Sequence, residues 1–249
     1  MPPAPTPAAL LAAVLTADPS GPLVTQYDDA TGERIELSAT TLDNWVAKTA
    51  NLLQDGGVEP GARAAVLLPP HWQTAAILLG CWSAGLSLVR GAADVAFTGT
   101  DRVAEALATG ADEVYGLSLA PMAMPLREVP AGVTDYATEV RGHGDRFAPY
   151  QPVDPSSAAV GTRSHAQVVA AATARAAELV ITAKDRVLID GSATGDGADA
   201  LDWLLVPLAA GASLVLCRNP EQSKLADRAT AERVTVTLGA SVTGIRRAD

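Results

Sequence analysis

The sequence is poor in basic, aromatic and histidine residues. Its 249 residues include 18 Lys and Arg against 28 Asp and Glu, 3 His and 4% aromatic residues. The formal net charge of −10 opposes phosphate backbones and anionic membrane surfaces, so neither nucleic acid nor a membrane is an expected partner. The three histidines, His71, His143 and His165, lack metal-ligand spacing such as H-E-x-x-H, and no G-x-S-x-G motif accompanies them. We therefore expect no metal site, no serine hydrolase and no assignable catalytic residue.

Cysteines are also scarce, and the N-terminal segment lacks the positive charges that begin a signal peptide. Cys81 and Cys217 lie far apart inside apolar runs, which does not make a secretory disulfide framework. We expect two reduced, buried thiols, neither with a basic or histidine neighbour to lower its pKa. The N-terminal apolar patch has no Lys or Arg ahead of it, unlike a signal peptide, so a cytoplasmic protein is expected.

A long stretch without charge lies between Arg63 and Arg90. It is long enough to span a bilayer, but Pro69-Pro70 and Gly85 interrupt it. The pattern instead predicts a strand over 64–68, a helix over 71–84 and a second strand over 86–89. This is a β-α-β unit, whose buried strands are apolar throughout.

The rest of the chain predicts the same alternation of strands and helices. Further strands are expected at 23–27, 34–37, 94–97, 113–117, 186–189, 213–217 and 234–238, the first two as a hairpin. Further helices are expected from Pro7, capped by Thr6, and at 40–54, 100–108, 164–180, 199–209 and 220–232. The pattern favours an α/β fold of mostly parallel sheets flanked by helices, in two lobes, 1–117 and 158–249, joined by a Pro/Gly-rich linker, 118–157. In such sheets ligands bind at the carboxyl ends of strands.

Two segments carry a family resemblance. The first contains Asn51-Leu52-Leu53, Gly57-Val58, Pro60-Gly61, Arg63, Leu68-Pro69, Leu79-Gly80-Cys81 and Ala84-Gly85; the second contains Asp185-Arg186-Val187-Leu188 and the run 205–216. They resemble the N-terminal part of the adenylate-forming (AMP-binding) superfamily, which includes acyl-CoA synthetases and peptide-synthetase adenylation domains. The likeness is to its short, uncharacterised actinobacterial members. It implies the two-lobed fold and ATP, AMP or CoA as possible ligands.

The chain departs from this family at the expected phosphate loop. The family places there a Thr/Ser/Gly-rich loop ending in Pro-Lys-Gly, whose backbone N–H groups cradle ATP phosphates. Here residues 154–165 keep Asp154 and Ser164-His165 but have one glycine and no lysine. Thr162, Arg163, Ser164 and His165 remain the candidates for nucleotide contact. The resemblance also places the adenine-binding motifs and the C-terminal domain beyond Asp249, so we expect a truncated member of the family.

A second candidate anion loop is the glycine-rich segment 191–197. It lies between an expected strand and an expected helix, a geometry that suits backbone binding of an anion, with Ser192, Thr194 and Gly195 as contacts. Its spacing fits neither G-x-G-x-x-G nor the Walker pattern, and Asp196 would repel phosphate. The alternative is a flexible connection.

Three carboxylates, Asp196, Asp199 and Asp202, share one helical face. This spacing is compatible with a cation site, but acidic residues in a first helical turn also complement the helix dipole. The second interpretation is the one we adopt.

The expected function follows from these departures. We expect a catalytically degenerate relative of the adenylate-forming enzymes that acts as a ligand-binding or protein-interaction module. The alternative is an AMP-binding, acyl-CoA-ligase-type enzyme that is active only with a complementing chain. Because the missing segments would leave apolar surface bare, we expect a homodimer or another protein partner on that face.

Overall fold

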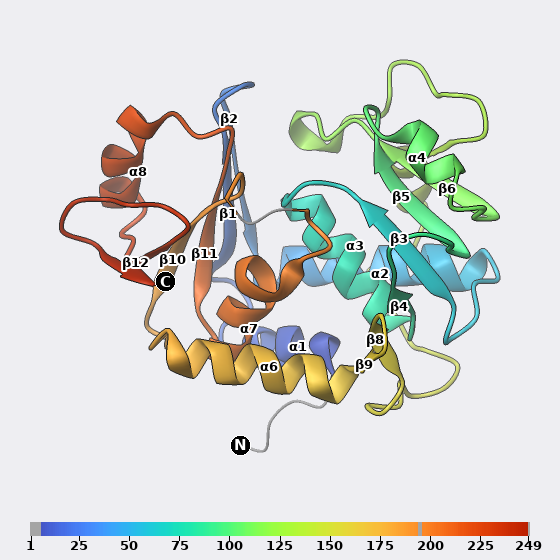
Figure 1. Ribbon diagram of the computed structural model, residues 1–249, viewed down its shortest axis with the longest axis horizontal. Helices are drawn as coiled ribbons and strands as arrows, with labels where there is room; N and C mark the ends of the chain where they lie inside the picture. The colour runs from blue at the N-terminus through green and yellow to red at the C-terminus, as the bar shows by residue number, and fades with distance from the viewer. Residues whose placement is uncertain (1–5, 194–195, 249) are drawn as a thin grey trace.

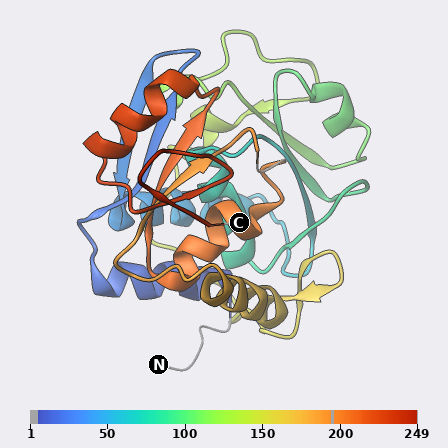
Figure 2. The same cartoon turned by 60° about the vertical axis from the view of Figure 1, so that its left-hand side comes forward.

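The computed structural model describes residues 6–193 and 196–248, which form two sheets separated by a layer of helices (Figure 1). Sheet A lies on the left of Figure 1 and sheet B on the right. Helix α8 (Leu225–Ala231) covers the outer face of sheet A, as Figure 2 shows from the side, and α4 (Val103–Leu107) covers that of sheet B. The result is a layered α/β fold, as the alternating pattern predicts.

Sheet A is parallel except for one hairpin. The hairpin pairs Tyr27 with Arg34, and its first strand then runs parallel to the neighbour that carries Cys217. In spatial order the strands are β13 (Arg246–Ala248), β12 (Val236–Leu238), β10 (Arg186–Asp190), β11 (Ser213–Arg218), β1 (Pro22–Asp28) and β2 (Glu33–Ser38).

Sheet B is likewise parallel except at its last pair, β8 and β9. In spatial order its strands are β7 (Thr134–Asp135), β6 (Glu113–Leu117), β5 (Val95–Gly99), β3 (Arg63–Leu67), β4 (Ser87–Leu88), β8 (Ala158–Val160) and β9 (Arg163–Ser164). Strand β3, helix α3 and strand β4 form the predicted β-α-β unit, which accounts for the charge-free stretch: all three elements are buried.

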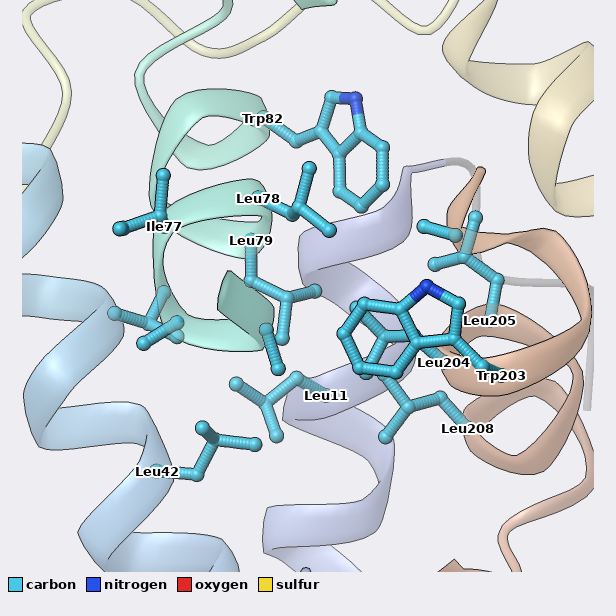
Figure 3. Close-up of a cluster of buried hydrophobic side chains, with 14 of the residues drawn as sticks. Leu11, Leu42, Ile77, Leu78, Leu79, Trp82, Trp203, Leu204, Leu205 and Leu208 are labelled. Atoms are coloured by element: carbon cyan, nitrogen blue, oxygen red, sulfur yellow. The ribbon is translucent and has the colours of Figure 1, made fainter. Parts of the chain in front are cut away.

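The central helices bury their apolar faces against both sheets. Trp82 and Trp203 are 0% and 1% exposed and lie among leucines from neighbouring helices (Figure 3). Burial of this much apolar surface is the main force that holds the layers together. The helices of this layer are α1 (Pro7–Ala17), α2 (Ala39–Asp55), α3 (Trp72–Ser83), α6 (His165–Glu178) and α7 (Val206–Ala210), with the π-helix η2 (Leu201–Leu205) leading into α7.

Most predicted elements are confirmed, and several are shorter than predicted. Thr6 caps α1 and Pro7 is its first residue. The predicted helix over 199–209 begins instead as η2, that over 100–108 is reduced to α4, and that over 220–232 is split into the 3₁₀ turn η3 (Gln222–Lys224) and α8.

The segment 118–157 contributes secondary structure of its own. It contains the 3₁₀ turn η1 (Pro121–Ala123), β7, and α5 (Tyr136–Val140), and the Tyr136 hydroxyl lies 2.7 Å from that of Thr49 in α2. Each sheet takes strands from both sides of this segment: β1 and β2 join sheet A, and β8 and β9 join sheet B. The division into lobes 1–117 and 158–249 stays a prediction.

No helix in the described part of the chain is long and apolar enough to cross a membrane.

Candidate functional site

A cleft of about 660 Å³ lies where strands of both sheets end. The residues that line it follow β3, β5 and β6 of sheet B and β10 and β11 of sheet A. They are Pro69, Pro70, Thr100, Asp101, Arg102, Leu119, Gly191, Ser192, Asp196, Arg218 and Asn219. We call this cavity the interlobe cleft. It lies where ligands of parallel sheets are expected, at the carboxyl ends of the strands.

Two arginines bring positive charge to the interlobe cleft. The Arg102 guanidinium is already paired with two carboxylates, Asp196 at 2.9 Å and Glu105 at 2.8 Å. Arg218 is held more loosely, with 3.4 Å between its Nη1 and Oδ2 of the buried Asp28. The Asn219 carboxamide donates to the other oxygen of Asp28. Arg218 is therefore the cation in the cleft with the most capacity to bind an anionic ligand.

The glycine-rich loop places Ser192 in the cleft but occupies its donors. The backbone N–H and the hydroxyl of Ser192 both donate to Oδ1 of Asp190, at 2.9 and 2.6 Å. Thr194 and Gly195, the other predicted contacts of this loop, lie outside the described residues. An anion at Ser192 would have to compete with a carboxylate that is already bonded there.

Gly197 has a packing role that its position in a glycine-rich loop did not suggest. Its N–H donates to the Leu68 carbonyl at 2.8 Å, and a Cβ there would lie 2.3 Å from that same oxygen. Trp203 donates its indole N–H to the Gly197 carbonyl at 3.0 Å. The loop therefore joins the two sheets by direct backbone contact at Gly197.

Residues 154–165 form a turn and a β-hairpin in place of an open phosphate loop. Ser156 and Ser157 donate their N–H groups to Asp154, and Gly161 donates to the Leu88 carbonyl. Ser164 and Gln167 bond reciprocally as a capping box at the start of α6. These N–H groups donate to other groups of the protein, so they are not available to a phosphate.

The four candidates of this hairpin lie away from Ser192. Thr162 and Arg163 are exposed, and Arg163 lines a cavity with Trp82 and Leu201 that shares no residue with the interlobe cleft. His165 is fully buried, and within the described residues neither ring nitrogen has a hydrogen-bond partner. Burial lowers the pKa of His165 to about 4, so the ring is neutral at pH 7.

Three arginines from different elements hold the carboxylates Asp196, Asp199 and Asp202. Arg102 binds Asp196, Arg90 binds Asp199 with both distances at 2.7 Å, and the Arg175 Nε lies 3.5 Å from Asp202. The carboxylates therefore diverge toward separate cations. Among residues 6–193 and 196–248, no group of three or more His, Cys, Asp or Glu side chains could hold a metal ion.

Comparison with known proteins gives one close relative. The relative is a Mycobacterium tuberculosis (strain ATCC 25618 / H37Rv) protein described as a TIGR03089 family protein. The two sequences are 49% identical over 238 residues, and the match covers 92% of this chain and 96% of the relative. The chain belongs to the TIGR03089 family. No family model matches the sequence.

Solved structures with the same fold include acyl-CoA synthetases. An acyl-CoA synthetase from Brucella canis matches with a TM-score of 0.75 and 16% identity, over 94% of this chain and 47% of that one. Acetoacetyl-CoA synthetase from Streptomyces lividans matches with a TM-score of 0.76 and 19% identity, over 94% and 42%. The chain thus spans about half the length of these enzymes and shares the fold of that half.

The two cysteines of this TIGR03089 family member are buried and unpaired. Burial raises the pKa of Cys81 to about 12. The prediction that neither cysteine has a basic neighbour is wrong for Cys217, whose sulfur lies 3.5 Å from Nη1 of Arg228 on α8. Burial nonetheless dominates, and the pKa of Cys217 is raised.

Sequence reasoning missed Arg102, Arg218 and Asn219. A signal was present for Arg218 and Asn219, because polar residues that directly follow an apolar strand lie at the edge where parallel sheets bind ligands. No local signal marked Arg102, whose partner Asp196 lies 94 positions away.

Proposed function

We propose that this protein is a ligand-binding or protein-interaction module with the N-terminal fold of acyl-adenylate-forming enzymes, and that it does not form adenylates by itself. The observation that carries the proposal is the hairpin over residues 154–165. Phosphate cradles work through several backbone N–H groups that point at one anion. In this chain those of Ser156, Ser157 and Gly161 donate to other groups of the protein.

The proposed ligand is a small molecule that carries one anionic group and binds in the interlobe cleft. Arg218 supports this choice because its bond to Asp28 is long, at 3.4 Å, and its side chain is 28% exposed. A nucleotide or a CoA-type molecule has such a group. The fold likeness to acyl-CoA synthetases keeps open the alternative of an enzyme that is completed by a second chain.

Calorimetric titration with Mg-ATP, AMP, an acyl-adenylate analogue and CoA tests the proposal. We expect saturable binding of at least one of them, about tenfold weaker for Arg218→Ala, and no pyrophosphate exchange with candidate acids. Ligand at about a hundred times its Kd should raise the unfolding free energy by roughly 2.7 kcal/mol.

The control is Arg233→Ala, which removes an exposed arginine outside the interlobe cleft and should leave binding unchanged. Pyrophosphate exchange by the isolated chain would overturn the proposal in favour of an enzyme. If none of the four ligands binds, the proposed ligand-binding role is wrong and the proposed protein-interaction role stands.

A further inference from the structure

Both arginines of the interlobe cleft are paired with carboxylates of the chain itself. Arg218 lies 3.4 Å from Asp28, and Nη1 of Arg102 lies 2.9 Å from Oδ2 of Asp196. Arg102 follows β5 of sheet B and Asp196 follows β10 of sheet A, and both residues line the cleft. The carboxylate of Asp196 therefore reaches across the cleft to a guanidinium that borders the space for a ligand.

Arg102 does not need Asp196 to balance its charge. Glu105, three residues further along in α4, accepts two hydrogen bonds from the same guanidinium, from Nε at 2.9 Å and from Nη2 at 2.8 Å. One carboxylate in this two-bond geometry matches the single charge of a guanidinium. Glu105 leaves the Nη1 end open, and Asp196 occupies that end. Asp196 is thus a second carboxylate on one cation, in the position that an anionic group of a ligand could take.

The glycine-rich loop has other contacts that hold it in place. The Gly197 N–H donates to the Leu68 carbonyl at 2.8 Å. The Asp199 N–H donates to the Asp196 carbonyl at 2.9 Å, and the Trp203 indole donates to the loop at 3.0 Å. All three bonds end on backbone atoms, so none of them uses the Asp196 carboxylate. The effect of that carboxylate is to place negative charge in the cleft.

We propose that Asp196 is an internal competitor for anions in the interlobe cleft: its carboxylate occupies Arg102, and an anionic group of a ligand gains that guanidinium only by displacing it. Asp196 then determines specificity. A ligand with one anionic group binds at Arg218 without disturbing Asp196, whereas a further anionic group has to release Asp196 from Arg102. The inference rests on the proposed function, because it concerns the same cleft and says what limits its ligands.

Calorimetric titration with inorganic pyrophosphate, a small anion of high charge, tests this proposal in the absence of divalent cations. The unmodified chain is compared with Asp196→Asn, which has nearly the same shape without the charge. We expect Asp196→Asn to bind pyrophosphate about tenfold more tightly, because it frees Arg102 and removes a repulsion. The additional replacement Arg102→Ala should abolish the gain. Since the competition is electrostatic, the gain should shrink between about 0.05 M and about 0.5 M salt.

Asp199→Asn is the matched control. It removes a carboxylate three residues away that is paired with Arg90 and does not line the interlobe cleft, so it should leave pyrophosphate binding unchanged. Thermal unfolding checks that each variant is folded; if Asp196→Asn is not, Asp196→Ser removes the same charge with a smaller side chain. A residue with a purely structural role gives weaker or unchanged binding when it is replaced, and either result for Asp196 would overturn the proposal.

The two proposals can fail separately. If the nucleotides and CoA do not bind the unmodified chain but Asp196→Asn gains affinity for pyrophosphate, the proposed ligand-binding role is wrong and the competition by Asp196 stands. If one of those ligands binds the unmodified chain and Asp196→Asn gains no affinity for pyrophosphate, the cleft is a ligand site in which Asp196 does not compete.

Discussion

His71 joins two roles that are usually separate, because it caps a helix and stays neutral inside the core. Its Nδ1 accepts the Gln73 N–H at 3.1 Å at the start of α3. The side chain is buried, and burial together with the positive charge of Arg218 lowers its pKa to about 3. Since Nδ1 accepts, the single proton of the neutral ring is on Nε2.

This lowered pKa predicts a loss of stability in acid. The unfolded state, with a histidine pKa near 6.5, takes up the proton before the folded state does. The contribution of His71 is therefore fully present above about pH 6.5 and is lost as pH falls toward 3. Between pH 6 and 4 it should lower the unfolding free energy by about 1.4 kcal/mol per pH unit.

His71→Asn keeps an acceptor for the Gln73 N–H and should remove this part of the slope. Urea unfolding at pH 7, 6 and 5 measures the change of the unfolding free energy with pH for the unmodified protein and for the variant. His165, with its pKa lowered to about 4 by burial, supplies a further slope that both retain. If the unfolding free energies of the two proteins fall equally with pH, His71 does not cause the loss of stability in acid.

At the scale of elements, the start of α6 is fixed by reciprocal hydrogen bonds between Ser164 and Gln167. The hydroxyl of Ser164 accepts the Gln167 N–H at 3.2 Å, and the Gln167 side chain accepts the Ser164 N–H at 2.9 Å. The hairpin of β8 and β9 leads directly into this cap. If Ser164 contacted a phosphate, its replacement would weaken ligand binding. If it caps the helix, its replacement lowers the stability of α6.

Ser164→Ala distinguishes these roles. We expect it to lower the unfolding free energy by about 1 kcal/mol and to leave AMP and CoA binding unchanged. Thr162→Ala, in the exposed turn beside it, should change stability by less than about 0.5 kcal/mol. Chemical denaturation and calorimetry measure the two quantities. Weaker nucleotide binding with unchanged stability would return Ser164 to the phosphate role.

The elements that could be predicted from the sequence are those with local signals. Thr6-Pro7 begins α1 and Ser164 begins α6 because capping depends on neighbours within one turn. Strands β7, β8, β9 and β13 were not predicted, since each has only two or three residues and exists through pairing with distant strands. The candidate contacts with a ligand stay predictions: Ser192 lines the interlobe cleft and Arg163 lies at another cavity, and long-range packing alone places the two residues apart.

At the scale of the whole molecule, two of the exposed large apolar side chains lie close together in the sequence. Met122 is 77% exposed and Met124 56%, and both belong to the segment that follows β6 at the end of sheet B. Exposed apolar surface of this kind favours association. We propose that the chain forms a homodimer through this segment.

Light scattering should therefore give twice the 25.4 kDa mass of one chain at micromolar concentration. The double variant Met122→Ser, Met124→Ser should give the mass of one chain, because it removes the apolar contact without touching the core. A monodisperse monomer for the unmodified protein would contradict the homodimer.

The strand order of sheet A determines when this sheet can be completed during synthesis of the chain. β1 leaves the ribosome early, but its parallel neighbour β11 begins only at Ser213, near the end of the 249 residues. At about 5–20 residues per second, the N-terminal hairpin waits roughly 10–40 s for that neighbour. During this interval Leu23 and Val24 of β1, which are buried in the complete fold, lack the neighbouring strand β11. We therefore expect the nascent chain to depend on chaperones and its yield to rise with slow, cool expression.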